Sequence, residues 1–240
     1  FAAINKHSVQ EGFLVSGMLI PLCVPVDIPW AMLAAAVVFA VVIGKEVFGG
    51  TGMNVLNVAL VTRAFLFFAY PTKMSGDKVW INTDLADGQQ LVDGFSGATP
   101  LGNAVKGGEQ ALIDTHASLM EAIIGFIPGS IGETSVIAIG LGALLLLITG
   151  IGSWRIMLLT FLGGYLMGVI FNFFGDAGSY LAVPALHQLM LGGFAFGVVF
   201  MATDPVTAAQ TNKGQWVYGL LIGFLAILIR DRKSTRLNSS

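Results

Sequence analysis

Seven apolar windows without charged residues run along the chain, separated by charged or polar residues. They cover residues 12–26, 28–44, 47–62, 134–154, 156–175, 177–203 and 214–229. A helix needs about 20 residues to cross the hydrocarbon core of a bilayer, and the usual range is about 17–25. The pattern therefore predicts full spans at 134–154 and 156–175. The windows 12–26 and 214–229 are shorter and predict half-helices or re-entrant segments.

Two stretches of backbone-breaking residues interrupt or end these windows. GGTGMN (49–54) lies within one window, and TDPVT (203–207) ends another. Broken segments at corresponding positions in two halves of a membrane protein are typical of an inverted repeat with a central site. We therefore predict an all-α fold, a polytopic membrane helical bundle with broken or re-entrant helices and an inverted repeat.

Polarity divides the chain into four parts. Residues 1–70 and 134–230 form two sets of transmembrane helices, and residues 71–133 form a polar interval with eight acidic residues against three lysines. Residues 231–240, DRKSTRLNSS, resemble vector read-through, so we expect this tail to be non-native and the chain, which opens on Phe1, to be a fragment. Lys and Arg favour the cytoplasmic side of a membrane. Placing Lys45 inside puts the 71–133 interval outside, so this loop is predicted to face outward.

Composition agrees with a lipid bilayer as the surroundings of the chain. Hydrophobic residues make up 55% of the sequence and charged residues 11%, against about a quarter charged in soluble domains. The net charge of −2 argues against nucleic acid as a partner. The single cysteine, Cys23, excludes a disulfide within one chain and an iron–sulfur cluster held by this chain alone. The three histidines show no metal-ligand spacing, so no firm metal site is predicted.

The polar interval contains the string DGFSGAT, residues 93–99. Small side chains before Thr99 let a bulky group approach the backbone, and Pro100 restricts φ immediately after it. No histidine lies nearby to activate the threonine as a nucleophile. The pattern therefore favours Thr99 as the acceptor of a covalently attached group, with an ordinary Gly/Ser turn as the alternative.

DGFSGAT is similar to the flavinylation motif in which a threonine carries FMN through a phosphoester bond. The strings GKEVFGGTG (44–52), RAFLFFAYP (63–71) and GFIPGSIGETS (125–135) extend the resemblance over about residues 11–230. Together they resemble the B subunit of the sodium-translocating NADH:quinone reductase more closely than its relative, the D subunit of Rnf-type complexes. The chain departs from that pattern at Val58, where the family carries proline, and at 85–92, which lengthens the run before the motif.

The resemblance implies a fold similar to urea and ammonia channels and a multi-pass location in the bacterial inner membrane. It implies an oxidoreductase and translocase subunit that carries covalent FMN and noncovalent riboflavin and passes electrons to ubiquinone, coupled to Na⁺ export. NADH would bind another subunit of the complex, and a separate flavin transferase would attach the FMN. The implied flavin-site residues are Thr99, as the phosphoryl threonine, with Asp93, Ser96, Gly97 and Ala98. An Rnf-type subunit, a passive channel or transporter, and a purely structural membrane subunit are the alternatives.

Several polar residues lie within or beside the apolar windows. Asn54 and Asn57 are three apart, on one helical face. Their amides suit the polar edge of an isoalloxazine ring or a quinone carbonyl, or else cap a broken helix or bridge helices. Arg63 is expected to be functional, or to snorkel or pair with Glu46. Asp204 is a weak candidate for a Na⁺ path, or a helix N-cap followed by Pro at the first position.

Glycine-containing strings predict two further features. The segment 129–134, GSIGET, could hold a phosphate or flavin at the N-terminus of the following helix, or simply cap that helix. Glycines four residues apart allow helices to approach closely. The pairs Gly164–Gly168 and Gly193–Gly197 therefore predict dense helix packing.

Overall fold

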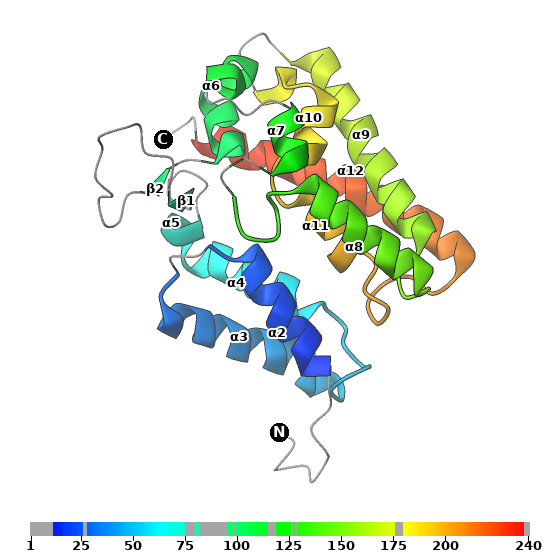
Figure 1. Ribbon diagram of the computed structural model, residues 1–240. Helices are drawn as coiled ribbons and strands as arrows, with labels where there is room; N and C mark the ends of the chain where they lie inside the picture. The colour runs from blue at the N-terminus through cyan, green and yellow to red at the C-terminus, as the bar shows by residue number, and fades with distance from the viewer. Residues whose placement is uncertain are drawn as a thin grey trace.

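The computed structural model describes residues 12–25, 28–74, 80–81, 96–97, 99–114, 119–125, 127, 129–175 and 180–237. The elements among these residues are mostly helices, joined by turns and loops, which confirms the all-α prediction (Figure 1). The only strands among the described residues are a two-residue antiparallel pair, β1 (Trp80–Ile81) and β2 (Ser96–Gly97), with Trp80 opposite Gly97.

The helices form two groups that share one core. The first part of the chain contains α2 (Gly12–Cys23), α3 (Trp30–Gly44), η1 (Glu46–Phe48), α4 (Val58–Ala69) and α5 (Pro71–Met74). The second contains α6 (Pro100–Asp114), α7 (Leu119–Ile124), α8 (Val136–Ile148), α9 (Trp154–Phe174), η2 (Tyr180–Ala182), α10 (Ala185–Met190), α11 (Phe194–Phe196), the π-helix η3 (Gly197–Met201) and α12 (Asn212–Leu237). Figure 1 shows α2, α3 and α4 together at one end and α9 beside α12 at the other. Buried Ile20 and Leu66 from the first group pack in one core with Leu189, Phe194 and Ile227 from the second.

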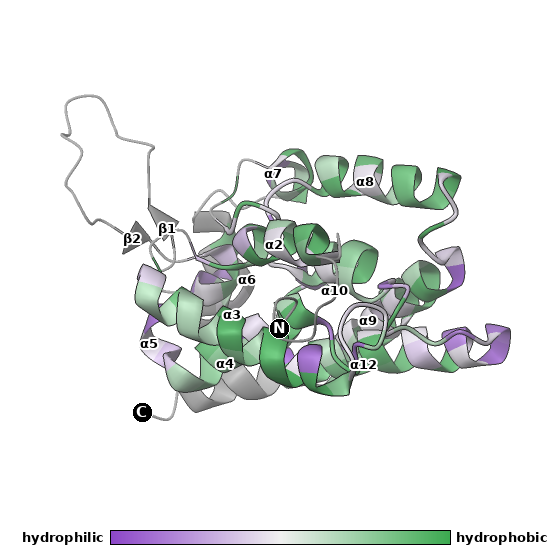
Figure 2. Cartoon of the chain, turned by 90° about the horizontal axis from the view of Figure 1, so that it is seen from below, coloured by the Kyte–Doolittle hydropathy of each residue, from purple (hydrophilic) through white to green (hydrophobic). Residues whose placement is uncertain are grey.

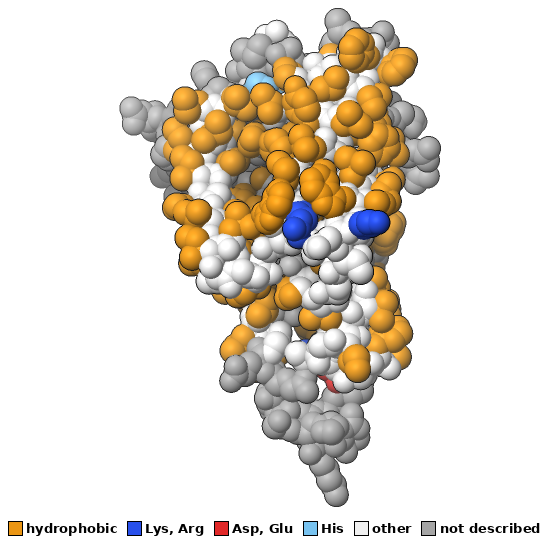
Figure 3. All heavy atoms as spheres, turned by 90° about the vertical axis from the view of Figure 1, so that its right-hand side faces the viewer, with side chains coloured by type: hydrophobic (Ala, Val, Ile, Leu, Met, Phe, Trp, Pro, Cys, Tyr) orange, Lys and Arg blue, Asp and Glu red, His pale blue; other side chains and the backbone are white. Residues whose placement is uncertain are grey.

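Three helices in the described part of the chain are long and apolar enough to cross a membrane: Trp30–Phe48, Trp154–Phe174 and Asn212–Arg230. Three shorter apolar helices, Gly12–Cys23, Val58–Ala69 and Val136–Ile148, accompany them. Figure 2 shows α3 and α8 hydrophobic along most of their length. Figure 3 shows hydrophobic side chains over most of the face to which α8, α9 and α12 contribute. Exposed side chains such as Leu141 and Leu221 belong to these helices, so the surface suits lipid or an apolar partner.

Two of the predicted segment lengths are wrong. The window 134–154 contains only the 13-residue α8, which is about 20 Å long at 1.5 Å per residue, short of a hydrocarbon core of about 30 Å. It ends at Ile148 because the chain turns at Gly150, where φ is +71°. Conversely, 214–229 is not a short segment but part of the 26-residue α12, which continues to Leu237. Charged Arg and Lys end a hydropathy window, but both residues have a high helix propensity, so the helix continues through them. The expectation that residues 231–240 are non-native stays a prediction.

The predicted helix breaks are confirmed. The window 47–62 is not one helix: it contains the end of η1, a turn, extended residues and the start of α4. Gly49, Gly50 and Gly52 have φ of +119°, +91° and +91°, a region that glycine enters without steric cost. The second predicted break, 203–207, lies in the turn region between η3, which ends at Met201, and α12, which begins at Asn212. The division of the window 177–203 into η2, α10, α11 and η3 was not predicted. The inverted repeat itself stays a prediction.

The polar interval 71–133 is not a single loop, because α5, the β pair, α6 and α7 lie within it. Residues 75–79, 82–95, 98, 115–118, 126 and 128 of this interval are outside the described residues. The side of the membrane that the interval faces stays a prediction.

Glycines bring α9 and α12 into backbone contact. A Cβ on Gly163 would collide with the carbonyl oxygen of Leu220, and one on Gly223 would collide with that of Thr160. This contact was not predicted, since these two glycines are far apart in sequence.

The predicted glycine pairs have mixed outcomes. A Cβ on Gly164 would lie 2.5 Å from the Phe194 ring, and one on Gly168 would lie 2.9 Å from Cβ of Ala185, so this pair permits close packing as predicted. Gly197 has open space around it, so its predicted packing role is wrong.

Candidate functional site

Thr99 lies at the start of α6 and lines a cavity of about 240 Å³, here called the Thr99 cavity. Its Oγ1 accepts a hydrogen bond from the backbone N–H of Gly102, 3.2 Å away, as an N-cap threonine does. The other predicted flavin-site residues are only partly placed: Ser96 and Gly97 form β2, while Asp93 and Ala98 lie outside the described residues. The cavity is lined by Cys23, Pro25, Arg63, Met74, Thr99, Pro100, Leu101, Ile127, Gly129, Ser130, Glu133, Gly192, Gly193 and Arg230.

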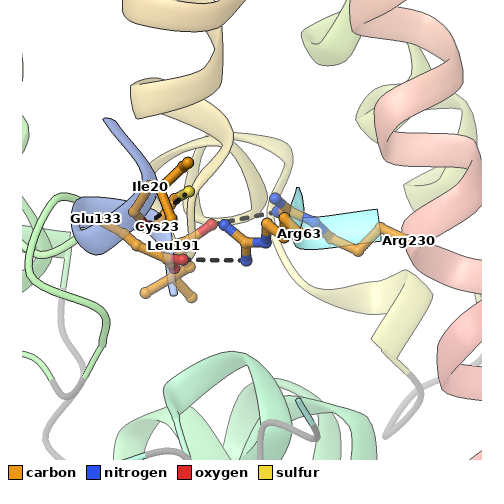
Figure 4. A network of polar contacts seen from close by, with 6 residues as sticks. All are labelled: Ile20, Cys23, Arg63, Glu133, Leu191 and Arg230. Carbon is orange, nitrogen blue, oxygen red and sulfur yellow. Dashed lines mark hydrogen bonds and ion pairs between the residues drawn. The ribbon is translucent and has the colours of Figure 1, made fainter. Parts of the chain in front are cut away.

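An ion pair crosses this cavity between α4 and the segment before α8. Nη2 of Arg63 lies 3.1 Å from Oε1 of Glu133, with the arginine side chain 38% exposed and the glutamate 10% exposed (Figure 4). The expected pairing of Arg63 with Glu46 is therefore wrong. Sequence proximity favoured Glu46, but Glu46 lies before the glycine turn, and α4 directs Arg63 toward Glu133 instead.

A second arginine reaches the Thr99 cavity from α12. Nη1 of Arg230 donates to the carbonyl oxygens of Gln188 at 2.6 Å and Leu191 at 3.2 Å. These carbonyls lie at the C-terminal end of α10, where helix carbonyls lack partners within the helix. The Arg230 guanidinium also lies 5.9 Å from the centre of the Phe194 ring. Sequence reasoning missed Arg230 because it borders the charged tail; the available signal was an arginine directly adjoining an apolar window.

The segment 129–134 contributes to the cavity but does not cap α8. The cap is Ser135, whose Oγ accepts from the backbone N–H of Ala138 at 3.3 Å. Ser130 lines the Thr99 cavity and is 5% exposed. Its Oγ has no hydrogen-bond partner among the described residues. A buried hydroxyl without a partner marks a place where a ligand or water completes the hydrogen bonding.

A second, larger cavity of about 540 Å³ lies beside α4, α9 and α12 and is called the Asn57 cavity. Most of its lining is apolar, and Asn57, Thr160 and Tyr218 supply polar groups. Oγ1 of Thr160 is buried and has no hydrogen-bond partner in the described part of the chain. The full lining is Val55, Leu56, Asn57, Leu60, Arg63, Thr160, Gly193, Phe194, Gly197, Val198, Met201, Ala202, Thr207, Tyr218, Ile222, Ala226 and Arg230.

Asn57 is both a helix cap and a bridge between the two broken segments. Its Oδ1 accepts from the backbone N–H groups of Ala59 and Leu60, at 3.0 and 3.2 Å, at the start of α4. Its Nδ2 donates to Oδ2 of Asp204 at 3.0 Å. The cap-and-bridge interpretation is confirmed for Asn57. Asn54 is not in the lining of either cavity, and its buried Oδ1 has no hydrogen-bond partner among the described residues. A ligand shared by the two amides stays a prediction.

Asp204 organises a turn and not the start of a helix. Its Oδ2 also accepts from Oγ1 of Thr207 at 2.9 Å, and its Oδ1 accepts from the backbone N–H of Val206 at 3.2 Å. The expected helix N-cap is wrong, because the next helix begins only at Asn212. A role in a Na⁺ path stays a prediction.

The two cavities share a wall of three residues, Arg63, Gly193 and Arg230. A Cβ on Gly193 would lie 3.2 Å from both Nη1 of Arg63 and Oε1 of Glu133, so glycine leaves room for that ion pair. A Cβ on Gly192 would lie 3.7 Å from Nη2 of Arg230. Figure 4 shows both arginines at this place, Arg63 directed at Glu133 and Arg230 at the carbonyl of Leu191.

Known proteins are similar to this chain over nearly the whole length of the chain. It is 51% identical over 231 residues to the B subunit of the Na(+)-translocating NADH-quinone reductase of Ectopseudomonas mendocina (strain ymp), covering 96% of this chain and 55% of that protein. The B subunits of the same reductase from Azotobacter vinelandii and Chromohalobacter salexigens are each 48% identical over 231 residues, covering 96% of this chain and 55% and 54% of theirs. The chain thus spans about half the length of these relatives.

The family profile described as "NQR2, RnfD, RnfE family" matches residues 1–235. That match and the identity to the relatives confirm the resemblance carried by the motifs. The chain belongs to the NQR2, RnfD, RnfE family.

Proposed function

We propose that the chain is part of the B subunit of a Na⁺-translocating NADH–quinone reductase in a bacterial inner membrane. The proposal is supported by the names of the relatives, the family match and the membrane-length helices. Its work would be electron transfer toward ubiquinone coupled to Na⁺ export, within a complex whose other subunits bind NADH. Export against a membrane potential costs about 2.3 kcal/mol per ion per 100 mV, which electron transfer must supply.

Covalent FMN on Thr99 is the central part of this proposal, and the DGFSGAT string is the observation that carries it. The residues around Thr99 suit a phosphate: two arginines line the same cavity, and so does the Ser130 hydroxyl, which has no hydrogen-bond partner among the described residues. A phosphoester oxygen on Thr99 keeps the lone pairs that accept the Gly102 N–H bond, so attachment is compatible with the α6 cap. FMN would supply the electron chemistry, while the chain would position it and tune its surroundings.

The Asn57 cavity is proposed to hold the second ring ligand, riboflavin or ubiquinone. Its volume of about 540 Å³ falls within the roughly 300–1,000 Å³ of pockets that enclose whole small molecules. Thr160 offers a buried hydroxyl without a partner among the described residues, which a ring carbonyl would satisfy. Asn57 would act mainly by shaping the cavity, because its amide is already used by α4 and Asp204.

Fluorescence on a denaturing gel tests the attachment site, in a host that supplies the flavin transferase. Thr99→Ala and Thr99→Leu should abolish the fluorescent band, because the phosphoester needs the hydroxyl oxygen. Thr72→Ala, at an exposed threonine of α5, should leave it unchanged. Fluorescence that survives on the Thr99→Ala protein would refute the assignment. A wild-type protein without any flavin would instead favour the channel or structural alternatives.

A further inference from the structure

Among the residues that the structure describes, the lining of the Thr99 cavity includes one positive charge without a carboxylate partner. The charged side chains of this described lining are two arginines and one glutamate. Glu133 pairs with Arg63. Arg230 has no carboxylate partner in the described part of the chain and is bonded to the neutral carbonyls of Gln188 and Leu191. Since arginine stays protonated in proteins, one positive charge is available to an anion.

The cavity also offers a hydroxyl donor that nothing else in the described chain uses. Ser130 is 5% exposed, its Oγ has no partner there, and it lines the cavity together with both arginines. A guanidinium fork and a hydroxyl are suited to several oxygens of one tetrahedral anion.

The volume indicates a compact group and not a whole cofactor. At about 240 Å³, the Thr99 cavity is smaller than the roughly 300–1,000 Å³ of pockets that enclose whole small molecules. A phosphoryl group suits this space, and the ring of a larger ligand would lie outside it.

We propose that the Thr99 cavity is a phosphoryl-binding site in which Arg230 and Ser130 hold the phosphate of the flavin, while Glu133 fixes Arg63 beside it. The identification of the ligand as a flavin phosphate rests on the proposed attachment of FMN at Thr99. The positive charge of Arg230 and the free hydroxyl of Ser130 are observed independently of that attachment, among the described residues. A phosphodiester carries one negative charge, which matches the one arginine in the described part of the lining that has no carboxylate partner. A phospholipid headgroup has the same chemistry and is the other source that a test must distinguish.

Two flavins with the same ring provide the test. The Thr99→Ala protein, purified in detergent with its complex, is titrated with FMN and with riboflavin, and binding is followed by quenching of flavin fluorescence. FMN should bind at least about tenfold more tightly than riboflavin, because charge-assisted hydrogen bonds to phosphate are among the strong ones. Inorganic phosphate should displace FMN and leave riboflavin bound. Equal affinities for the two flavins would overturn the proposal.

Variants at the site assign the residues. Arg230→Gln should remove most of the preference for FMN, and Ser130→Ala should reduce it. Arg155→Gln is the matched control, since Arg155 bonds Asn212 and stacks on Trp154 and lines neither cavity. SDS-induced unfolding followed by tryptophan fluorescence reports whether each variant is folded, because Arg230 also lines the Asn57 cavity that is proposed to hold riboflavin or ubiquinone. If Arg230→Gln is unfolded, Arg230→Lys replaces it: this variant keeps the charge and should retain part of the preference.

The remaining outcomes separate this inference from the attachment at Thr99. A preference for FMN that persists in folded Arg230→Gln and Ser130→Ala proteins would overturn the residue assignment. Displacement of FMN by phosphatidylglycerol in mixed detergent micelles, but not by inorganic phosphate, would assign the site to a lipid headgroup and overturn the flavin assignment. Gel fluorescence of the Thr99→Ala protein is scored separately from flavin binding. Covalent attachment at Thr99 can therefore be refuted while the phosphoryl-binding site is supported, and the phosphoryl-binding site can be refuted while covalent attachment is supported.

Discussion

Replacing Asn57 tests whether the link between the two broken segments stabilises the fold. Asn57→Ala removes the cap of α4, which costs about 1 kcal/mol, and removes the bond to Asp204. A hydrogen bond to a charged group contributes about 1.5–3 kcal/mol. The lower end applies, because Asp204 keeps its bonds from Thr207 and Val206. We expect Asn57→Ala to lower the free energy of unfolding by about 2–3 kcal/mol.

Two further variants separate these contributions. Asn57→Ser keeps a capping oxygen but lacks the Nδ2 donor, so it should lose only the Asp204 bond, about 1.5 kcal/mol. Ser135→Ala removes the comparable cap of α8, which has no such bridge, and should lose about 1 kcal/mol. The assay is SDS-induced unfolding in mixed micelles followed by tryptophan fluorescence.

The result that refutes this reasoning is a loss in Asn57→Ala no larger than in Ser135→Ala. The same samples can be extracted for noncovalent flavin and assayed for quinone reduction. If stability falls while both flavin content and quinone reduction are unchanged, Asn57 is only a structural cap and bridge. A fall in ligand content in the well-folded Asn57→Ser protein would support a ligand in the Asn57 cavity.

Two other predictions concern packing and topology. Gly223→Val should separate α9 from α12 and lower the free energy of unfolding by about 1–3 kcal/mol or more in the same assay, as overpacking does. The control is Gly197→Ala, which places a methyl group in open space and should change stability little. A Gly223→Val protein as stable as the wild type would contradict the packing described. In a Cys23→Ser background, Lys73→Cys should react with an impermeant maleimide added outside the inner membrane, whereas Lys213→Cys should react only after lysis. Both positions are exposed in the structure. The opposite labelling pattern would invert the topology.

Local chemistry was readable from the sequence, and distant contacts were not. The glycine turn before α4 and the break at 203–207 followed from glycine and proline, because these residues restrict or free the backbone locally. Helix lengths were less predictable, since charged residues end a hydropathy window but not a helix: α12 continues beyond Arg230.

The candidate site shows the same limit. Thr99 was identified because its motif is contiguous. Its companions in the cavity come from α4, the segment before α8, and α12, and no spacing rule relates them. The partner of Arg63 was therefore assigned to the near Glu46 in place of the distant Glu133.

The wall of Arg63, Gly193 and Arg230 gives the two cavities a common set of groups. A ligand in one cavity that drew a guanidinium of this wall toward itself would withdraw it from the other cavity, and the two affinities would then be linked. Linkage of this kind is reciprocal, with the same coupling free energy in both directions. Gly193 keeps the wall thin, because a side chain there would displace the Arg63–Glu133 pair. The two cavities would then behave as one cooperative unit.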